Sequence, residues 1–259
     1  MAERVWDRFL TEQDRAHVAM KPPRRIGFGQ RPALLLIDLY RWVFGNKPEP
    51  ILEATKNWPG SCGTAGWNSL PYIQKLLGTA REIGIPIIHI TGLPEDEVEP
   101  WSFRGEKPNM SPEARERRKG RFEIVDEVKP LPGEAVLRKA SPSAFWGTPL
   151  AGHLNYLDVD TVITCGESTS GCVRASVVEG ATYRLRMIVV EECVFDRHEA
   201  CHAINLFDMN QKYADVLPLA EVLQYLHQWG EKNRARATGG DGEGGRRLVV
   251  DAPPFKAYR

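Results

Sequence analysis

Hydrophobic residues along this chain occur in short unbroken runs that alternate with amphipathic stretches. Six runs have the composition of strands buried on both faces. They span residues 33–38, 85–91, 134–139, 160–166, 186–192 and, more weakly, 213–218. Between them, apolar residues recur at helical spacing over 69–84, 171–185 and 220–230. The pattern therefore predicts strands and helices in alternation.

Such alternation is typical of an α/β fold. We predict a three-layer, doubly wound and mainly parallel six-stranded sheet with helices on both faces. Functional residues of these folds gather at the carboxyl ends of the strands. Asp38, Lys139 and the turn from Gly166 to Cys172 all follow or end predicted strands, so they are the first candidates for chemistry.

The alternating pattern covers residues 26–231, which we interpret as one domain. An extension of residues 1–25 precedes it, and the glycine-rich composition of 232–259 predicts a flexible tail. Residues 92–131 form a long charged connection that we interpret as a lid or a subunit contact. The extension and the tail are candidates for exchange between subunits.

Composition narrows the classes of partner. The 259 residues include 34 basic and 34 acidic side chains, so no global field favours nucleic acid or an anionic membrane. No apolar run approaches the ~18 residues of a membrane helix, and the first residues lack a signal-peptide pattern. The five cysteines are scattered without a CxxC pair, which argues against disulfides and structural zinc. We expect a cytoplasmic protein that acts on small molecules.

Cys172 lies in the stretch GESTSGCVRASVVEG, at the start of a predicted helix. The partial positive charge of a helix amino terminus would lower the pKa of a thiol there. Unpaired N–H groups of the same turn would stabilise an oxyanion. Alternatively, a cysteine among small residues simply packs well, and this stretch alone leaves both interpretations open.

Asp38 and Lys139 are the other strand-end candidates. Desolvation would raise the pKa of the Asp38 carboxyl toward the range of a general base, although Asp38 could also be the first polar residue of a loop. Lys139 would stabilise a thiolate if it lay beside Cys172; otherwise it is a surface cation.

Three ordered motifs carry a family resemblance: the acid after the first strand, KASPSAF at 139–145 and GESTSGCV at 166–173. Together they resemble the isochorismatase-like cysteine hydrolases. Two segments, TSGCVRASVVEG and the later VVEECVFDRHEACHAINLFDMNQKYADV, are similar to the sequences of the N-carbamoylsarcosine amidase branch. The resemblance covers roughly residues 26–228.

The resemblance implies a catalytic set of Asp38, Lys139 and Cys172, and a cis peptide bond between Glu167 and Ser168. It also implies an oxyanion hole formed by the backbone N–H groups of Ser168 and Cys172. The implied activity is hydrolysis of a small carbamoyl, ureide or amide compound through a thioester, with release of ammonia. No cofactor is implied, and relatives of this kind are homodimers or homotetramers.

Nicotinamidases of the superfamily add a metal site made of an acid and two histidines after the first strand. This chain has no histidine between Asp38 and His89, so we expect no metal. His198 and His202 are four residues apart on a predicted helix, but a solvated helix face explains them without a third ligand.

Candidate substrate-binding residues follow from the same resemblance. Arg197 matches an arginine that binds a substrate carboxylate, although a salt bridge beside Asp196 or Glu199 is the alternative. Gln211 matches a glutamine that holds a ureide in biuret hydrolases; otherwise it is an ordinary helix residue. Aromatic residues that would wall the pocket, or belong to the core instead, are Tyr40, Trp42, Phe145 and Trp146.

Glu167 departs from the cysteine, alanine or valine usual at its position. This extra acid would repel an anionic substrate or pair with Arg174. The identity of the substrate therefore stays undecided between several alternatives. The alternatives are an N-carbamoylsarcosine-like compound, a maleamate-type amide acid, and biuret or another ureide. A non-catalytic binding protein is the rival class, and the complete set of three candidate catalytic residues argues against it.

Overall fold

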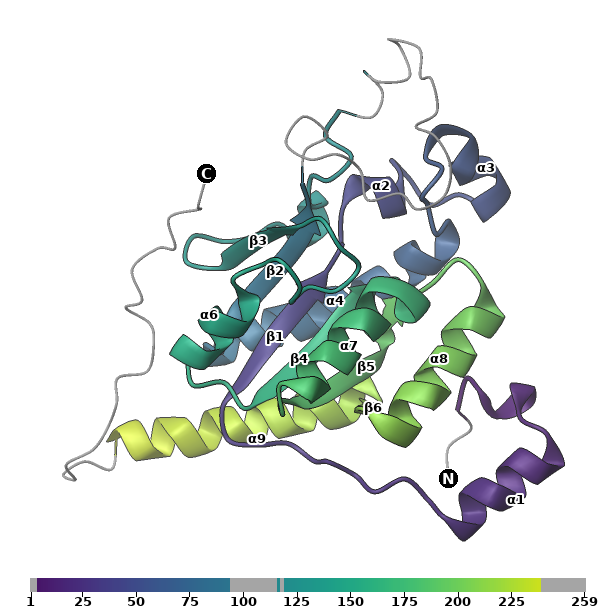
Figure 1. The fold of residues 1–259 in the computed structure, drawn as a ribbon. Helices are drawn as coiled ribbons and strands as arrows, with labels where there is room; N and C mark the ends of the chain where they lie inside the picture. Colours follow the sequence, from purple (N-terminus) through teal and green to yellow (C-terminus); the bar gives the residue numbers. More distant parts are fainter. Residues whose placement is uncertain (1–3, 94–115, 117–118, 239–259) are drawn as a thin grey trace.

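The computed structural model describes residues 4–93, 116 and 119–238. Within this part, six strands form one sheet in the order β3-β2-β1-β4-β5-β6 (Figure 1). Every neighbouring pair is parallel, which confirms the predicted fold class. The strands are β1 Pro32–Ile37, β2 Ile87–Gly92, β3 Ala135–Lys139, β4 Thr161–Glu167, β5 Arg186–Phe195 and β6 Asp215–Leu217.

Helices cover both faces of the sheet. Helices α4 and α9 lie on one face, and α6, α7 and α8 lie on the other (Figure 1). The short helices α2 and α3 lie near the carboxyl ends of the strands. The bounds are α2 Arg41–Phe44, α3 Ile51–Asn57, α4 Thr64–Ile83, η2 Asp126–Val128, α6 Leu150–Tyr156, α7 Arg174–Thr182, α8 Glu199–Lys212 and α9 Leu219–Thr238.

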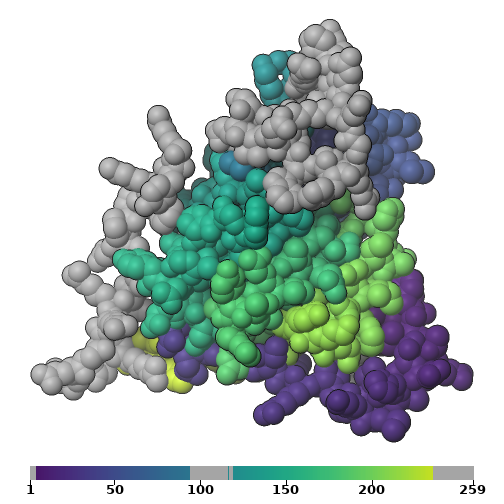
Figure 2. All heavy atoms as spheres, viewed as in Figure 1, coloured from purple at the N-terminus to yellow at the C-terminus, as the bar shows by residue number. Residues whose placement is uncertain are grey.

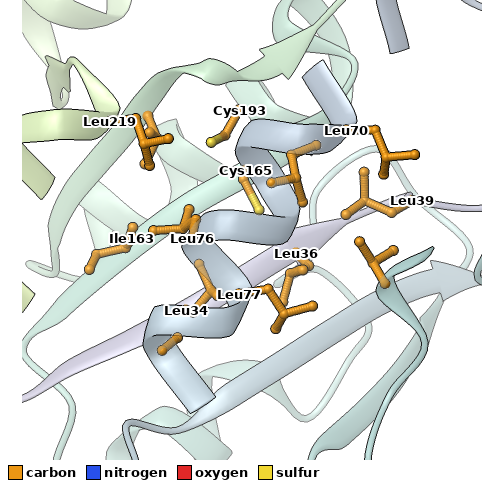
Figure 3. Close-up of a cluster of buried hydrophobic side chains, with 14 of the residues drawn as sticks. Leu34, Leu36, Leu39, Leu70, Leu76, Leu77, Ile163, Cys165, Cys193 and Leu219 are labelled. Atoms are coloured by element: carbon orange, nitrogen blue, oxygen red, sulfur yellow. The ribbon is translucent and has the colours of Figure 1, made fainter. Parts of the chain in front are cut away.

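The α4 face of the core shows how the sequence pattern becomes packing. Leu70, Ile73, Leu76 and Leu77 recur at helical spacing and are all buried. They pack on side chains of β1, β4 and β5 (Figure 3). Helix α4 ends where Gly84 adopts a left-handed conformation with φ of 75°, which glycine reaches without steric cost.

The described part of the amino-terminal extension folds onto its own chain. It contains η1 (Asp7–Phe9) and α1 (Glu12–Met20). Trp6 is buried, with its ring 6.2 Å from that of Phe207 in α8, and Arg4 forms an ion pair with Glu191. Figure 2 shows this segment against the green surface of the carboxyl-terminal half.

Some boundaries differ from the sequence prediction. Strand β5 continues to Phe195, with a register shift against β4 between Thr164 and Gly166. Helix α9 continues to Thr238, so the first residues of the predicted tail are helical. Residues 239–259, and most of the 92–131 connection, lie outside the described residues. None of the described helices is both long and apolar enough to cross a membrane.

Candidate active site

Asp38, Lys139 and Cys172 meet at the carboxyl end of the sheet. Asp38 follows β1, Lys139 is the last residue of β3, and Cys172 lies in the turn after β4. The Nζ atom of Lys139 is 2.8 Å from Oδ2 of Asp38 and 3.3 Å from Sγ of Cys172. The structure therefore brings together the three residues that the sequence selected, with the lysine between the acid and the thiol.

Asp38 is fully buried, in a backbone conformation with φ of 56° that is uncommon for a residue other than glycine. Its N–H donates to the carbonyl of Ile90, which fixes it between β1 and β2. Among the described residues, neither carboxylate oxygen has a hydrogen bond of good geometry, although Oδ2 is ion-paired with Lys139. Burial raises the pKa of Asp38, and the charge of Lys139 opposes that rise.

Lys139 is the cation of the cluster. Burial alone would lower the pKa of this lysine, but the negative charge of Asp38 raises it above its usual range. The ammonium also donates to the carbonyl of Ser141 at 3.0 Å. Lys139 therefore stays protonated beside both reacting groups.

Cys172 lies in a five-residue π-helical turn, η3, Thr169–Val173, directly before α7. Burial raises the pKa of its thiol, Asp38 raises it further, and Lys139 opposes the rise. Burial of the thiol therefore acts against the lowering expected from a helix amino terminus. The resting thiol is neutral, so nucleophilic attack requires a neighbouring base to take its proton.

The turn before Cys172 has the cis peptide bond that the resemblance implied, between Glu167 and Ser168. Gly166 has φ of 116°, and a Cβ atom there would lie 2.0 Å from the carbonyl oxygen of Ile37. Only glycine therefore fits where β4 passes the end of β1. The oxyanion-hole role of the Ser168 and Cys172 amides stays a prediction.

Ser176 is a residue that the sequence analysis missed. Its hydroxyl donates to the carbonyl of Cys172 at 2.7 Å and accepts from the N–H of Ala144 at 2.9 Å. This buried side chain thus joins the turn of Cys172 to the loop after Lys139. The sequence signal for this contact is the spacing of four residues between Cys172 and Ser176, which puts the two on one face of a helix.

Arg197 is held in an ion pair with Glu167. Its Nη1 lies 2.7 Å from Oε1 of Glu167, and its Nη2 donates to the carbonyl of Gly60. The thiol of Cys62 contacts the same Oε1 at 3.6 Å. The sequence analysis missed these contacts because the segment between α3 and α4 carries no recognisable motif.

Glu167 does not pair with Arg174, which corrects one of its two predicted roles. Arg174 instead forms an ion pair with Asp208 of α8 at 2.5 Å. Arg174 is the first residue of α7, whereas Arg197 follows the end of β5. Of these two arginines, Arg197 is the one that contacts Glu167. Glu167 and Phe195 are register partners, which places Arg197 two residues beyond the glutamate's neighbour.

Burial raises the pKa of Glu167 to about 7, against the opposing charge of Arg197. An acid whose pKa is higher in the folded than in the unfolded state binds the extra proton between the two values. Its contribution to stability is therefore complete below the unfolded pKa and is lost as the pH rises to the folded one.

The stability of the wild type relative to Glu167→Gln should accordingly fall by about 3 kcal/mol as the pH rises from about 4.5 to about 7. Urea unfolding of both proteins across this range measures the difference. Glu191→Gln is the matched control, because Glu191 also pairs with an arginine but at another place on the sheet. A stability difference independent of pH would contradict the burial of an ionisable Glu167.

The remaining predicted binding residues are placed differently. Tyr40 is buried near Asp38 and Glu167. Burial raises the pKa of its hydroxyl, and the charges of these two carboxylates raise it further. Phe145 packs in the core, with its ring 5.5 Å from that of Tyr183, as the alternative interpretation holds. Trp146 is 54% exposed.

Gln211 lies in the last turn of α8, near the start of β6. Helix α8 contacts the turn of Cys172 and α7 through His202 and Asp208. Within the described residues Gln211 forms no hydrogen bond with Asp38, Lys139 or Cys172, and its ureide-binding role stays a prediction.

His202 contacts the turn rather than a metal ligand set. Its Nδ1 lies 2.8 Å from the hydroxyl of Thr169, the first residue of η3. In the part of the chain that the structure describes, no three His, Cys, Asp or Glu side chains are grouped to hold a metal ion.

A doubly wound sheet with an acid, a lysine and a cysteine at its carboxyl edge defines a class of α/β cysteine hydrolases. Comparison with known proteins identifies the family. Residues 32–221 match the isochorismatase domain model, and the chain belongs to the isochorismatase family.

Named relatives narrow the activity. The chain is 37% identical over 205 residues to maleamate amidohydrolase from Pseudomonas putida, covering 78% of this chain and 90% of that protein. It is 32% identical over 213 residues to N-carbamoylsarcosine amidase from an Arthrobacter species, covering 78% and 74%. The chain is therefore a hydrolase of amide C–N bonds, an amidohydrolase.

The solved structures agree on the fold. A cysteine hydrolase from Pseudomonas syringae matches with a TM-score of 0.66 at 17% identity, covering 81% of this chain and 99% of that chain. At this identity the likeness concerns the fold alone.

Proposed function

We propose that this enzyme cleaves the C–N bond of a small carbamoyl, ureide or amide compound through a thioester on Cys172, and releases ammonia. The observation that carries the proposal is the position of the Lys139 ammonium, within 3.3 Å of the thiol and 2.8 Å of the Asp38 carboxylate. These three groups supply the nucleophile, the base and the compensating charge, so the proposed reaction needs no metal or cofactor.

The first half-reaction forms the thioester. Asp38 takes the proton of the Cys172 thiol while the sulfur attacks the substrate carbonyl carbon. Lys139 stabilises the developing thiolate, and the N–H groups of Ser168 and Cys172 stabilise the oxyanion. When the tetrahedral intermediate collapses, its C–N bond breaks and Asp38 returns the proton to the leaving nitrogen, which departs as ammonia.

The second half-reaction regenerates the thiol. Asp38 takes a proton from a water molecule, whose oxygen attacks the thioester carbon. The C–S bond then breaks, the acid product leaves, and the proton on Asp38 passes to the sulfur of Cys172. The raised pKa of the buried Asp38 suits this exchange, because the group must accept and donate a proton in each half-reaction.

The relatives suggest where to begin the search for the substrate. The names of the relatives make an N-carbamoylsarcosine-like compound and a maleamate-type amide acid the first compounds to test. Biuret and other ureides are the third candidates.

An ammonia-release screen over N-carbamoyl amino acids, amide acids, diamides and ureides tests the proposed function. We expect turnover of at least one compound by the wild type and none by Asp38→Asn, which keeps the size of the side chain but cannot accept the thiol proton. If Asp38→Asn released ammonia as fast as the wild type, the proposed roles would be wrong.

A further inference from the structure

Two cations of the described residues at this edge of the sheet are already paired within the protein. Lys139, which contacts the Cys172 thiol, is bound to Asp38, and Arg197 is bound to Glu167, the residue directly before the turn. A third carboxylate, Asp196, accepts hydrogen bonds from the N–H and the hydroxyl of Ser170 and from the N–H of Arg197. A substrate carboxylate that reached Lys139 or Arg197 would therefore meet a cation that already has an anionic partner.

Glu167 is firmly placed. Its side chain is 5% exposed, and it is the last residue of β4, directly before the turn that carries Cys172. Arg197 and the Cys62 thiol both contact Oε1. None of the hydrogen bonds among the described residues ends at Oε2, so this oxygen is the one that a substrate N–H would use.

The electrostatic reach of Glu167 includes the reacting groups. Its charge raises the pKa of the Cys172 thiol and of Tyr40, which also adjoins Asp38. A group close enough to act on the nucleophile also acts on a substrate bound there. For a carboxylate to take over Arg197, Glu167 would have to stay buried as an unpaired anion or take up a proton, and above its pKa of about 7 both cost free energy.

Building on the proposed function, we propose that Glu167 determines specificity: by occupying Arg197 and offering Oε2, it directs the enzyme to substrates whose far end is an uncharged N–H donor. Ureides and diamides have such an end, whereas amide acids and N-carbamoyl amino acids present a carboxylate. The carboxylate substrates named for the two relatives are then poorer substrates of this chain than their uncharged amides.

Binding in a Cys172→Ala background tests this inference independently of turnover. Maleamate and maleamide, its diamide, differ only in carrying a carboxylate or a carboxamide at the far end. Calorimetry at about pH 8, where Glu167 is mostly ionised, compares their Kd values for Cys172→Ala and for Cys172→Ala/Glu167→Gln. Glutamine keeps the size of the side chain, and thermal unfolding checks that each variant is folded.

With Glu167 intact, we expect the diamide to bind at least about tenfold more tightly than the amide acid. Glu167→Gln should reduce this preference at least fivefold, whereas Glu191→Gln, the matched control, should leave it unchanged. Equal Kd values with Glu167 intact, no binding of the diamide, or a preference unaltered by Glu167→Gln would each overturn the inference. Absence of ammonia release from any compound by the wild type would instead count against the proposed function.

Discussion

Cys172→Ala is expected to lower kcat for ammonia release by at least about 10⁴-fold, because no other group can form the covalent intermediate. The side chain lies within 3.3 Å of Lys139, and alanine removes only its sulfur. Steady-state ammonia production with the compound that gives the highest turnover is the measurement.

The matched control is Cys201→Ala. Cys201 is an exposed cysteine of α8, so its loss should change kcat by less than about twofold. Turnover by Cys172→Ala close to that of the wild type would remove Cys172 from the mechanism.

Lys139→Met is expected to lower the free energy of unfolding by about 3–5 kcal/mol near pH 7, because it leaves Asp38 buried without its counter-charge. Asp38 is fully buried, and the ammonium 2.8 Å away is its ion-pair partner. Activity should be lost as well, since the thiolate loses its stabilising cation. Urea denaturation and the ammonia assay measure the two effects.

Two further variants separate charge from packing. Lys139→Met/Asp38→Asn should regain most of the lost stability but no activity, because no charge is left unpaired and no base remains. Lys212→Met removes an exposed lysine paired with Asp208, and it should leave the free energy of unfolding nearly unchanged. A Lys139→Met protein as stable as the wild type would show that the pair contributes nothing to folding.

The parallel sheet and the three clustered residues could be predicted because each depends on local pattern. Runs such as 33–38 are apolar throughout since their strands are buried on both faces, and Asp38 is conspicuous as the acid at the end of such a run. Parallel strands bring their carboxyl ends to one edge, so Asp38, Lys139 and Cys172 were expected to be near one another.

The protonation of Cys172 could not be predicted from its position. A helix amino terminus favours the thiolate whereas desolvation favours the neutral thiol, and the partial burial of Cys172 is a property of the packed structure. The sequence analysis named only Arg174 as a partner for Glu167, and it placed the alternative salt bridge of Arg197 beside Asp196 or Glu199. The observed pair depends on the extension of β5 to Phe195, which brings Arg197 across to β4.

The positions of Gln211 and Phe145 show the limits of transferring residues by resemblance. The match places Gln211 in the last turn of α8, where within the described residues it forms no hydrogen bond with the three clustered residues. Phe145 follows the lysine motif closely, yet its ring packs against Tyr183 in the core. Both positions depend on the direction of a helix or loop, which a motif does not record.

Rapid acid quenching followed by peptide mass spectrometry tests the central claim, the thioester, most directly. In the first turnovers of the wild type, the peptide containing Cys172 should gain the mass of the substrate's acyl group, and the same peptide of Cys172→Ala should not. Ammonia release with no acylated Cys172 peptide at any quench time, or with the acyl group on another residue, would contradict the mechanism.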